Sequence, residues 1–262
     1  AVPDPSRPAV TIRVLGPLEV DVGGRPVTGG DVRRRRVQTL VELLAVLGPL
    51  RRERVAELLW GDRDPEAAAR NLRVTLSRVR SVVDPHRRGG DGAGPLRLDG
   101  DLVAIARTPT VEVDLWRFRE LVAVADVAAR RGDAVAEVEA LEQAIGLWRG
   151  DPCPALEDVV EAMGDVEALR VLLAETAVRL GELLLVCGRA AEAAVWAERA
   201  CRALPYAERA HRLAVTAHLQ AGDLAGVDRA AGVLAGALAE VGAEPERSTR
   251  MVLRQVEARR VG

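Results

Sequence analysis

Residues 54–83 have the sequence RVAELLWGDRDPEAAARNLRVTLSRVRSVV, in which two helical patterns flank the break GDRDP. The first helix is predicted over 52–60, where the apolar side chains share one face. The second is predicted over 65–83, because Pro65 and Glu66 are favourable in a first helical turn, where backbone N–H groups lack partners. The buried stripe of this second helix is expected to consist of Leu72, Leu76, Val79 and Val83.

The segment before this pair predicts a small sheet and one further helix. Residues 10–22 alternate apolar and polar side chains, and the glycines that follow them are a turn signal. From 32 to 47 apolar residues recur at spacings of three and four, as one face of a helix requires, and Gly48 and Pro49 end the pattern.

The segment after the pair predicts a hairpin. Residues 96–106, LRLDGDLVAIA, are two short apolar runs around Asp99 and Gly100. The order of sheet, three helices and hairpin therefore predicts an α+β winged helix-turn-helix domain over 10–107. The Pro-rich residues 1–9, AVPDPSRPA, are expected to be a linker or disordered.

From Asp114 onward the pattern is almost entirely helical, with Gly-containing turns at 130–134, 187–191 and 221–225. Gly188 and Gly222 lie 34 residues apart, which is the period of a helix-turn-helix repeat, and residues 149–159 form an inserted loop. The sequence thus predicts an all-α, tetratricopeptide-like domain over 108–262 and a mainly α chain. A helical domain without repeats stays open, because glycine turns occur there too.

One exposed face of the helix over 65–83 carries side chains suited to DNA. A helical wheel places them opposite the buried stripe. Arginine can bind guanine with two hydrogen bonds, asparagine can bind adenine in the same way, and valine can contact the thymine methyl. A solvated face of a surface helix is the alternative. The candidate DNA-binding residues on this helix are Arg70, Asn71, Val74, Ser77, Arg78 and Ser81.

Further arginines outside this helix are candidates for contacts with DNA phosphates. The run Arg33, Arg34, Arg35 and Arg36 opens the first long helix, where positive charge opposes the helix dipole. Phosphate contact explains this placement, but pairing with Asp31 and Glu42, or solvation, explains it equally well. In the hairpin, Arg97 is a weaker candidate for a minor-groove or backbone contact.

The charge distribution agrees with two different roles for the two parts of the chain. Residues 1–107 hold 19 Arg against 14 Asp and Glu, a net charge of +5, whereas the remainder carries −7 and the whole chain −2. A positive first part favours DNA and a negative second part does not. The chain has no lysine, which also fits a GC-rich genome.

Several classes of function are not expected. The three cysteines are scattered without a CxxC pair, and the three histidines, His86, His211 and His218, form no catalytic arrangement in the sequence. No apolar run approaches the roughly 20 residues that a membrane span needs. We therefore expect a cytoplasmic protein that is not an enzyme, with no membrane contact, no cofactor and no metal site.

Several motifs in order resemble one family. These are LGPLEV, RVAELLWGDRDPEAAARNLRVTLSRVR, VDLWRFRELV and ALEQAIGLWRGD, and the resemblance runs from about Val10 to Gln255. On these motifs the chain resembles the Streptomyces antibiotic regulatory protein family. In that family an OmpR-type winged helix precedes a bacterial transcriptional activator domain made of tetratricopeptide-like hairpins.

The resemblance implies a function as well as a fold. It implies that 65–83 is the recognition helix, that 96–106 is the wing, and that the protein activates transcription by binding direct repeats in double-stranded DNA near promoters. RNA polymerase and a second copy of the chain would be its protein partners. The alternative is an interaction module of a larger signalling protein in which DNA binding is weak or lost.

Overall fold

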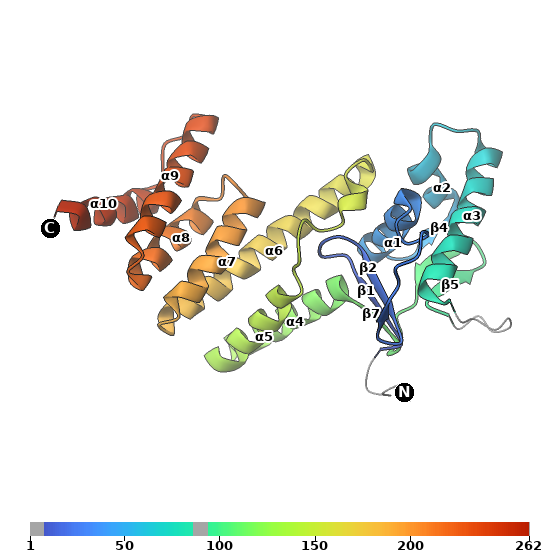
Figure 1. Ribbon diagram of the computed structural model, residues 1–262, viewed down its shortest axis with the longest axis horizontal. Coiled ribbons are helices and arrows are strands. Elements are labelled where there is room, and N and C mark those ends of the chain that lie inside the picture. The colour runs from blue at the N-terminus through green and yellow to red at the C-terminus, as the bar shows by residue number, and fades with distance from the viewer. Residues whose placement is uncertain (1–7, 86–93, 262) are drawn as a thin grey trace. The chain divides into compact units, whose positions relative to one another are not determined.

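The computed structural model describes residues 8–85 and 94–261 (Figure 1). Residues 1–7, most of the predicted linker, lie outside the described residues, and so does His86. The chain forms two compact units. The winged-helix unit comprises Ala1–Glu120 and Leu147–Ala168, and the helical unit comprises Leu121–Gly146 and Leu169–Gly262.

The four-stranded sheet of the winged-helix unit has the order β3-β2-β1-β7. Its strands are β1 (Val10–Arg13), β2 (Glu19–Val22), β3 (Arg25–Pro26) and β7 (Val111–Val113). The first three are antiparallel, as the alternating pattern predicts, whereas β7 pairs with β1 in parallel. The boundary predicted after residue 107 therefore lies inside this unit, because β7 completes the sheet that β1 begins.

Three helices follow the first hairpin: α1 (Arg35–Leu47), α2 (Arg52–Trp60) and α3 (Pro65–Val83). The bounds of α2 and α3 agree with the predicted ones. Helix α1 begins three residues later than predicted, because Asp31 and Arg34 close a turn and Arg34 is extended. Nine residues of α1 are buried, so α1 is the central helix of this unit.

The predicted hairpin is confirmed as β5 (Leu96–Asp99) and β6 (Leu102–Ile105), which pair antiparallel. Gly100 at its turn has a φ of 56°, a conformation that favours glycine. A two-residue strand that the sequence analysis missed, β4 (Leu50–Arg51), joins the other side of β6. The hairpin is thus the wing of a winged helix-turn-helix domain.

The inserted loop at 149–159 packs on the winged-helix unit. Its backbone N–H groups at Arg149 and Cys153 donate to Leu15 O and Val14 O, at 2.7 and 2.8 Å. The N–H of Ala155, in the 3₁₀ helix η1 (Pro154–Leu156), donates to the buried Glu42 carboxylate of α1 at 2.7 Å. This segment is therefore part of the winged-helix core, although it follows the predicted domain by more than forty residues.

The remaining elements are all helices, as predicted. They are α4 (Asp114–Arg130), α5 (Ala134–Gly146), α6 (Val160–Val186), α7 (Ala190–Ala203), α8 (Glu208–Ala221), α9 (Leu224–Val241) and α10 (Arg247–Val261). The division between the two units falls within α4 and within α6. Helices α7, α8 and α9 pack consecutively (Figure 1).

The glycine turns of the helical unit end helices as the sequence predicts. Gly132, Gly188 and Gly222 have φ values of 70°, 74° and 75°, so each needs the left-handed conformation that glycine adopts most easily. Across residues 8–85 and 94–261, no helix combines the length and apolar character that crossing a bilayer requires.

Candidate nucleic-acid interface

The position of α3 is fixed at its N-terminus and along its buried side. The Asp64 carboxylate accepts a hydrogen bond from Ala67 N at 3.1 Å, and Pro65 occupies the first turn, so the helix starts where capping favours it. The side that faces the core consists of Ala68, Leu72, Thr75, Leu76, Val79, Val82 and Val83. Burial of this stripe leaves the opposite face exposed.

The predicted contact residues of α3 lie on that opposite face. Arg70, Ser77 and Ser81 are exposed, and Val74 retains 48% of its surface although it is apolar. Asn71 and Arg78 are partly buried. The helix thus brings the six predicted side chains together as one surface, which we call the α3 face.

Acidic residues already contact the arginines of the α3 face. Arg70 Nη1 lies 3.6 Å from Glu66 Oε2, one turn earlier on the same helix. Arg78 Nε lies 3.8 Å from Asp31 Oδ1, which comes from the turn before α1. The charge of this surface is therefore partly balanced.

The arginine run at residues 33–36, which spans the start of α1, has several different partners. Arg34 Nε donates to Asp31 at 2.9 Å, so the pairing with Asp31 is present. Arg35 donates to Glu157 at 3.2 Å and to Asp158 at 2.9 Å, and Arg36 lies over the Trp60 ring. The expected pairing with Glu42 is absent.

Arg33 and Arg97 complete the set of predicted residues. Arg33 is exposed in the turn before α1, and Arg97 is exposed on β5, opposite Ala104. Both side chains are accessible to a ligand.

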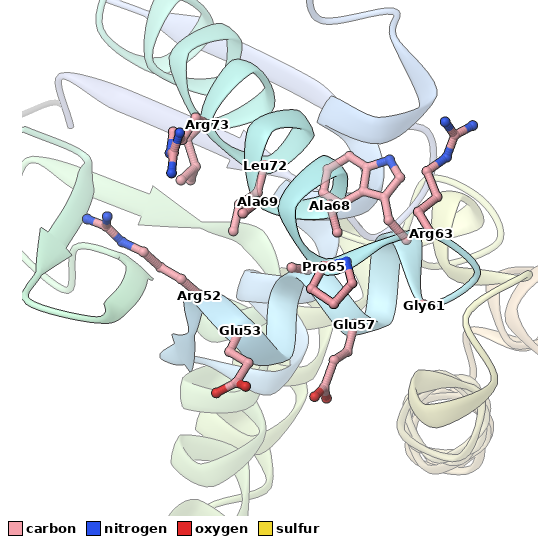
Figure 2. A pocket seen from close by; sticks show the side chains of 13 residues that line it. Arg52, Glu53, Glu57, Gly61, Arg63, Pro65, Ala68, Ala69, Leu72 and Arg73 are labelled. Carbon is pink, nitrogen blue, oxygen red and sulfur yellow. The ribbon is translucent and has the colours of Figure 1, made fainter.

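A pocket of about 460 Å³, which no sequence pattern predicted, lies between α2 and α3. Figure 2 shows Arg52 of α2 and Arg73 of α3 extending to one side of it and Arg63 to the other. Arg73 is exposed beside Val74. Helical spacing alone places Arg73 at the edge of the α3 face, so the wheel could have identified it.

The two described histidines are buried on α8. His211 Nε2 lies 2.7 Å from Pro205 O. His218 has Glu198 on one ring nitrogen at 2.9 Å and Asp223 on the other at 3.0 Å. Within the part of the chain that the structure describes, no three or more His, Cys, Asp or Glu side chains are grouped to hold a metal ion.

These features define a protein with a winged-helix unit and a helical unit. Residues 113–256 match the family model of the bacterial transcriptional activator domain, so the chain belongs to that family. The resemblance to the Streptomyces antibiotic regulatory proteins is confirmed, because the similar curated proteins are regulators of this kind.

Three curated regulators illustrate the similarity. The chain is 29% identical to regulatory protein AfsR of Streptomyces coelicolor over 55% of its length and 28% identical to AfsR of Streptomyces griseus over 82%. It is 30% identical to regulatory protein DnrI of Streptomyces peucetius over 58%. The matched regions cover only 14% and 21% of the two AfsR proteins and 55% of DnrI.

A solved structure has the same fold. EmbR of Mycobacterium tuberculosis, determined in complex with a low-affinity phosphopeptide, superposes with a TM-score of 0.73 over 96% of this chain and 65% of EmbR. The identity is 20%. This similarity confirms the arrangement of a winged helix followed by a helical activator domain.

Proposed function

We propose that the chain regulates transcription by binding specific double-stranded DNA, with α3 in the major groove, and that it acts as an activator and not as an enzyme. One observation carries the proposal: the α3 face presents arginine, asparagine, serine and an exposed valine on a helix whose other side is buried. A major groove about 12 Å wide admits one helix, and these side chains match the hydrogen-bonding edges and methyl groups of bases.

The surroundings of α3 support the same proposal. Arg97 in the wing and Arg33 before α1 are exposed cations that can contact phosphates and so fix the orientation of α3. The first 107 residues carry a net charge of +5, which favours a polyanion. Binding therefore should weaken steeply as the salt concentration rises.

Membership of the activator-domain family supports the further roles. We infer that the helical unit contacts RNA polymerase and that two copies bind direct repeats near promoters. The alternative is an interaction module of a larger protein, which the greater length of the AfsR proteins favours.

The test is selection of bound fragments from a random duplex library at low salt. Wild type is compared with an Arg70→Ala, Arg78→Ala double variant and with Arg117→Ala. Arg117→Ala is a control for the loss of a surface arginine outside the α3 face, because Arg117 is exposed on α4 and pairs with Glu120.

Wild type and the control should enrich one repeated motif, and the double variant should not. Each lost bidentate base contact is worth about 1–3 kcal/mol, so the double variant should bind the motif at least about tenfold more weakly. No enrichment by wild type would favour the interaction module instead. Run-off transcription with purified RNA polymerase on the enriched motif then tests activation separately.

A further inference from the structure

Asp31 joins the turn before α1 to the second half of α3. Its Oδ1 accepts from Arg34 Nε at 2.9 Å and lies 3.8 Å from Arg78 Nε. Its Oδ2 lies 3.2 Å from Ser81 Oγ, which is also 2.8 Å from Arg78 O. One carboxylate thus contacts three of the candidate DNA-binding residues, of which Arg78 and Ser81 belong to the α3 face.

These contacts are at the surface. The side chains of Asp31, Arg78 and Arg34 retain 39%, 40% and 54% of their accessible area. Exposed ion pairs contribute about 0–1 kcal/mol to stability, so folding alone gives little reason for this arrangement. Because Asp31 contacts Arg78 and Ser81 of the α3 face, these contacts indicate a role in DNA binding.

The Asp31 carboxylate weakens binding to the phosphate backbone of any DNA, whatever its sequence. Arg34 and Arg78 must leave Asp31 before they can neutralise phosphates, and the carboxylate itself repels phosphate. Non-specific binding consists almost entirely of such cation-phosphate contacts, so it bears the full penalty. In a specific complex, by contrast, an arginine already held in one orientation over α3 loses less side-chain entropy when it contacts a base.

We propose that Asp31 is a specificity-determining positioning residue, which restrains Arg34 and Arg78 so that DNA is bound for its sequence and not for its charge. The proposal rests on the proposed function of the α3 face. It predicts that removal of the Asp31 charge strengthens binding to arbitrary DNA more than binding to the selected motif.

The experiment uses Asp31→Asn in the full chain, with dissociation constants measured on the selected motif and on a scrambled duplex at several salt concentrations. Asparagine keeps one oxygen, which can accept from Arg34, and its amide nitrogen takes the place of the oxygen that Ser81 contacts. The matched control is Glu120→Gln, which removes the same charge from α4, where Glu120 pairs with Arg117. Thermal unfolding of each variant reports any loss of structure.

Asp31→Asn should bind the scrambled duplex about tenfold more tightly at low salt and reduce the ratio of the two affinities at least fivefold. Its salt dependence should steepen by about 0.9 in log–log slope for each arginine that gains a phosphate. The control should match wild type in ratio and slope.

The outcomes separate the two proposals. If wild type prefers its motif and Asp31→Asn keeps the same ratio and slope, the role of Asp31 is refuted and the proposed function stands. An equal loss of affinity for both duplexes with a lower unfolding temperature would make Asp31 structural and also refute the role. If wild type shows no preference, the proposed function fails and the role of Asp31 fails with it.

Discussion

Replacement of Glu42 by glutamine should remove a pH dependence of stability from the winged-helix unit. Glu42 is fully buried on α1, and its Oε2 accepts from Ala155 N at 2.7 Å. Burial raises the pKa of Glu42 from 4.5 to about 8, against the opposing effects of the Ala155 N–H and the Arg35 charge. The folded protein therefore holds a proton that the unfolded chain releases.

The sign and size of the effect follow from this pKa. Because the folded pKa lies above the unfolded one, the contribution of Glu42 to stability is complete below about pH 4.5 and is lost as pH rises through about 8. The full loss is about 5 kcal/mol, at about 1.4 kcal/mol per pH unit. Most of it has occurred by pH 7, and about 1.4 kcal/mol remains to be lost between pH 7 and pH 9.

The assay is urea unfolding at pH 7 and pH 9, followed by tryptophan fluorescence. Trp60, Trp116 and Trp148 belong to the winged-helix unit, so the signal reports mainly on that unit. Relative to Glu42→Gln, wild type should lose about 1.4 kcal/mol more between the two pH values. Glu42→Gln cannot ionise, and its amide oxygen can still accept from Ala155 N.

Because each protein is compared with itself at two pH values, any pH-independent loss of stability caused by the glutamine cancels. The Oε1 atom of Glu42 is buried without a hydrogen-bond partner, so an amide nitrogen there costs about 1–3 kcal/mol at both pH values. Glu120→Gln, an exposed substitution on α4, is the control and should follow wild type. If wild type and Glu42→Gln lose stability in parallel, Glu42 does not hold a proton in the folded protein.

Three further substitutions test packing and buried hydrogen bonds. Gly226→Ala should destabilise the helical unit by about 1–3 kcal/mol in urea unfolding, because the new methyl group would overlap the His218 ring, and an unchanged midpoint would contradict this packing. Asp114→Ala should lower the free energy of unfolding by about 2–4 kcal/mol, because the buried Asp114 carboxylate accepts from three backbone N–H groups. A loss below about 1 kcal/mol in the same assay would show that these hydrogen bonds contribute little to stability. Arg179→Ala should lower the free energy of unfolding by about 1–3 kcal/mol, because the Glu137 side chain is only 12% exposed and would lose its ion-pair partner. A calorimetric unfolding temperature equal to that of wild type would exclude this loss.

Local signals explain why much of the fold could be predicted. The bounds of α3 follow from Asp64 and Pro65 at one end and Asp84 at the other, all within one turn of the helix they delimit. The turns at Gly188 and Gly222 are equally local, since each needs a left-handed residue. Such signals operate over a few residues and can be recognised without knowledge of the tertiary structure.

The parts that were missed depend on contacts between distant residues. Strand β7 has three residues and exists because β1, one hundred residues earlier, offers it an edge. The position of the 149–159 loop depends on the hydrogen bond from Ala155 N to Glu42, which lies more than one hundred residues earlier in the chain. A short strand and a Pro-rich loop carry no periodicity that would reveal these partners.

The same distinction applies to the candidate site. A helical wheel suffices to predict the α3 face, because burial of one stripe determines what remains exposed. It does not predict that Asp31 would lie beside Arg78, since these residues meet only when the turn before α1 packs against α3. The wheel identifies candidate residues, and the tertiary structure identifies what restrains them.

The arginine run at residues 33–36 shows why a count of charges overstates the affinity for DNA. Arg34 and Arg35 are paired with carboxylates and Arg36 lies over an indole ring, so each would exchange a protein contact for a phosphate. An exchanged contact gains less free energy than a new one, although it still releases a counterion from the DNA. While these contacts hold, the run should therefore contribute little to the strength of binding or to its salt dependence, and the α3 face should determine the preferred sequence.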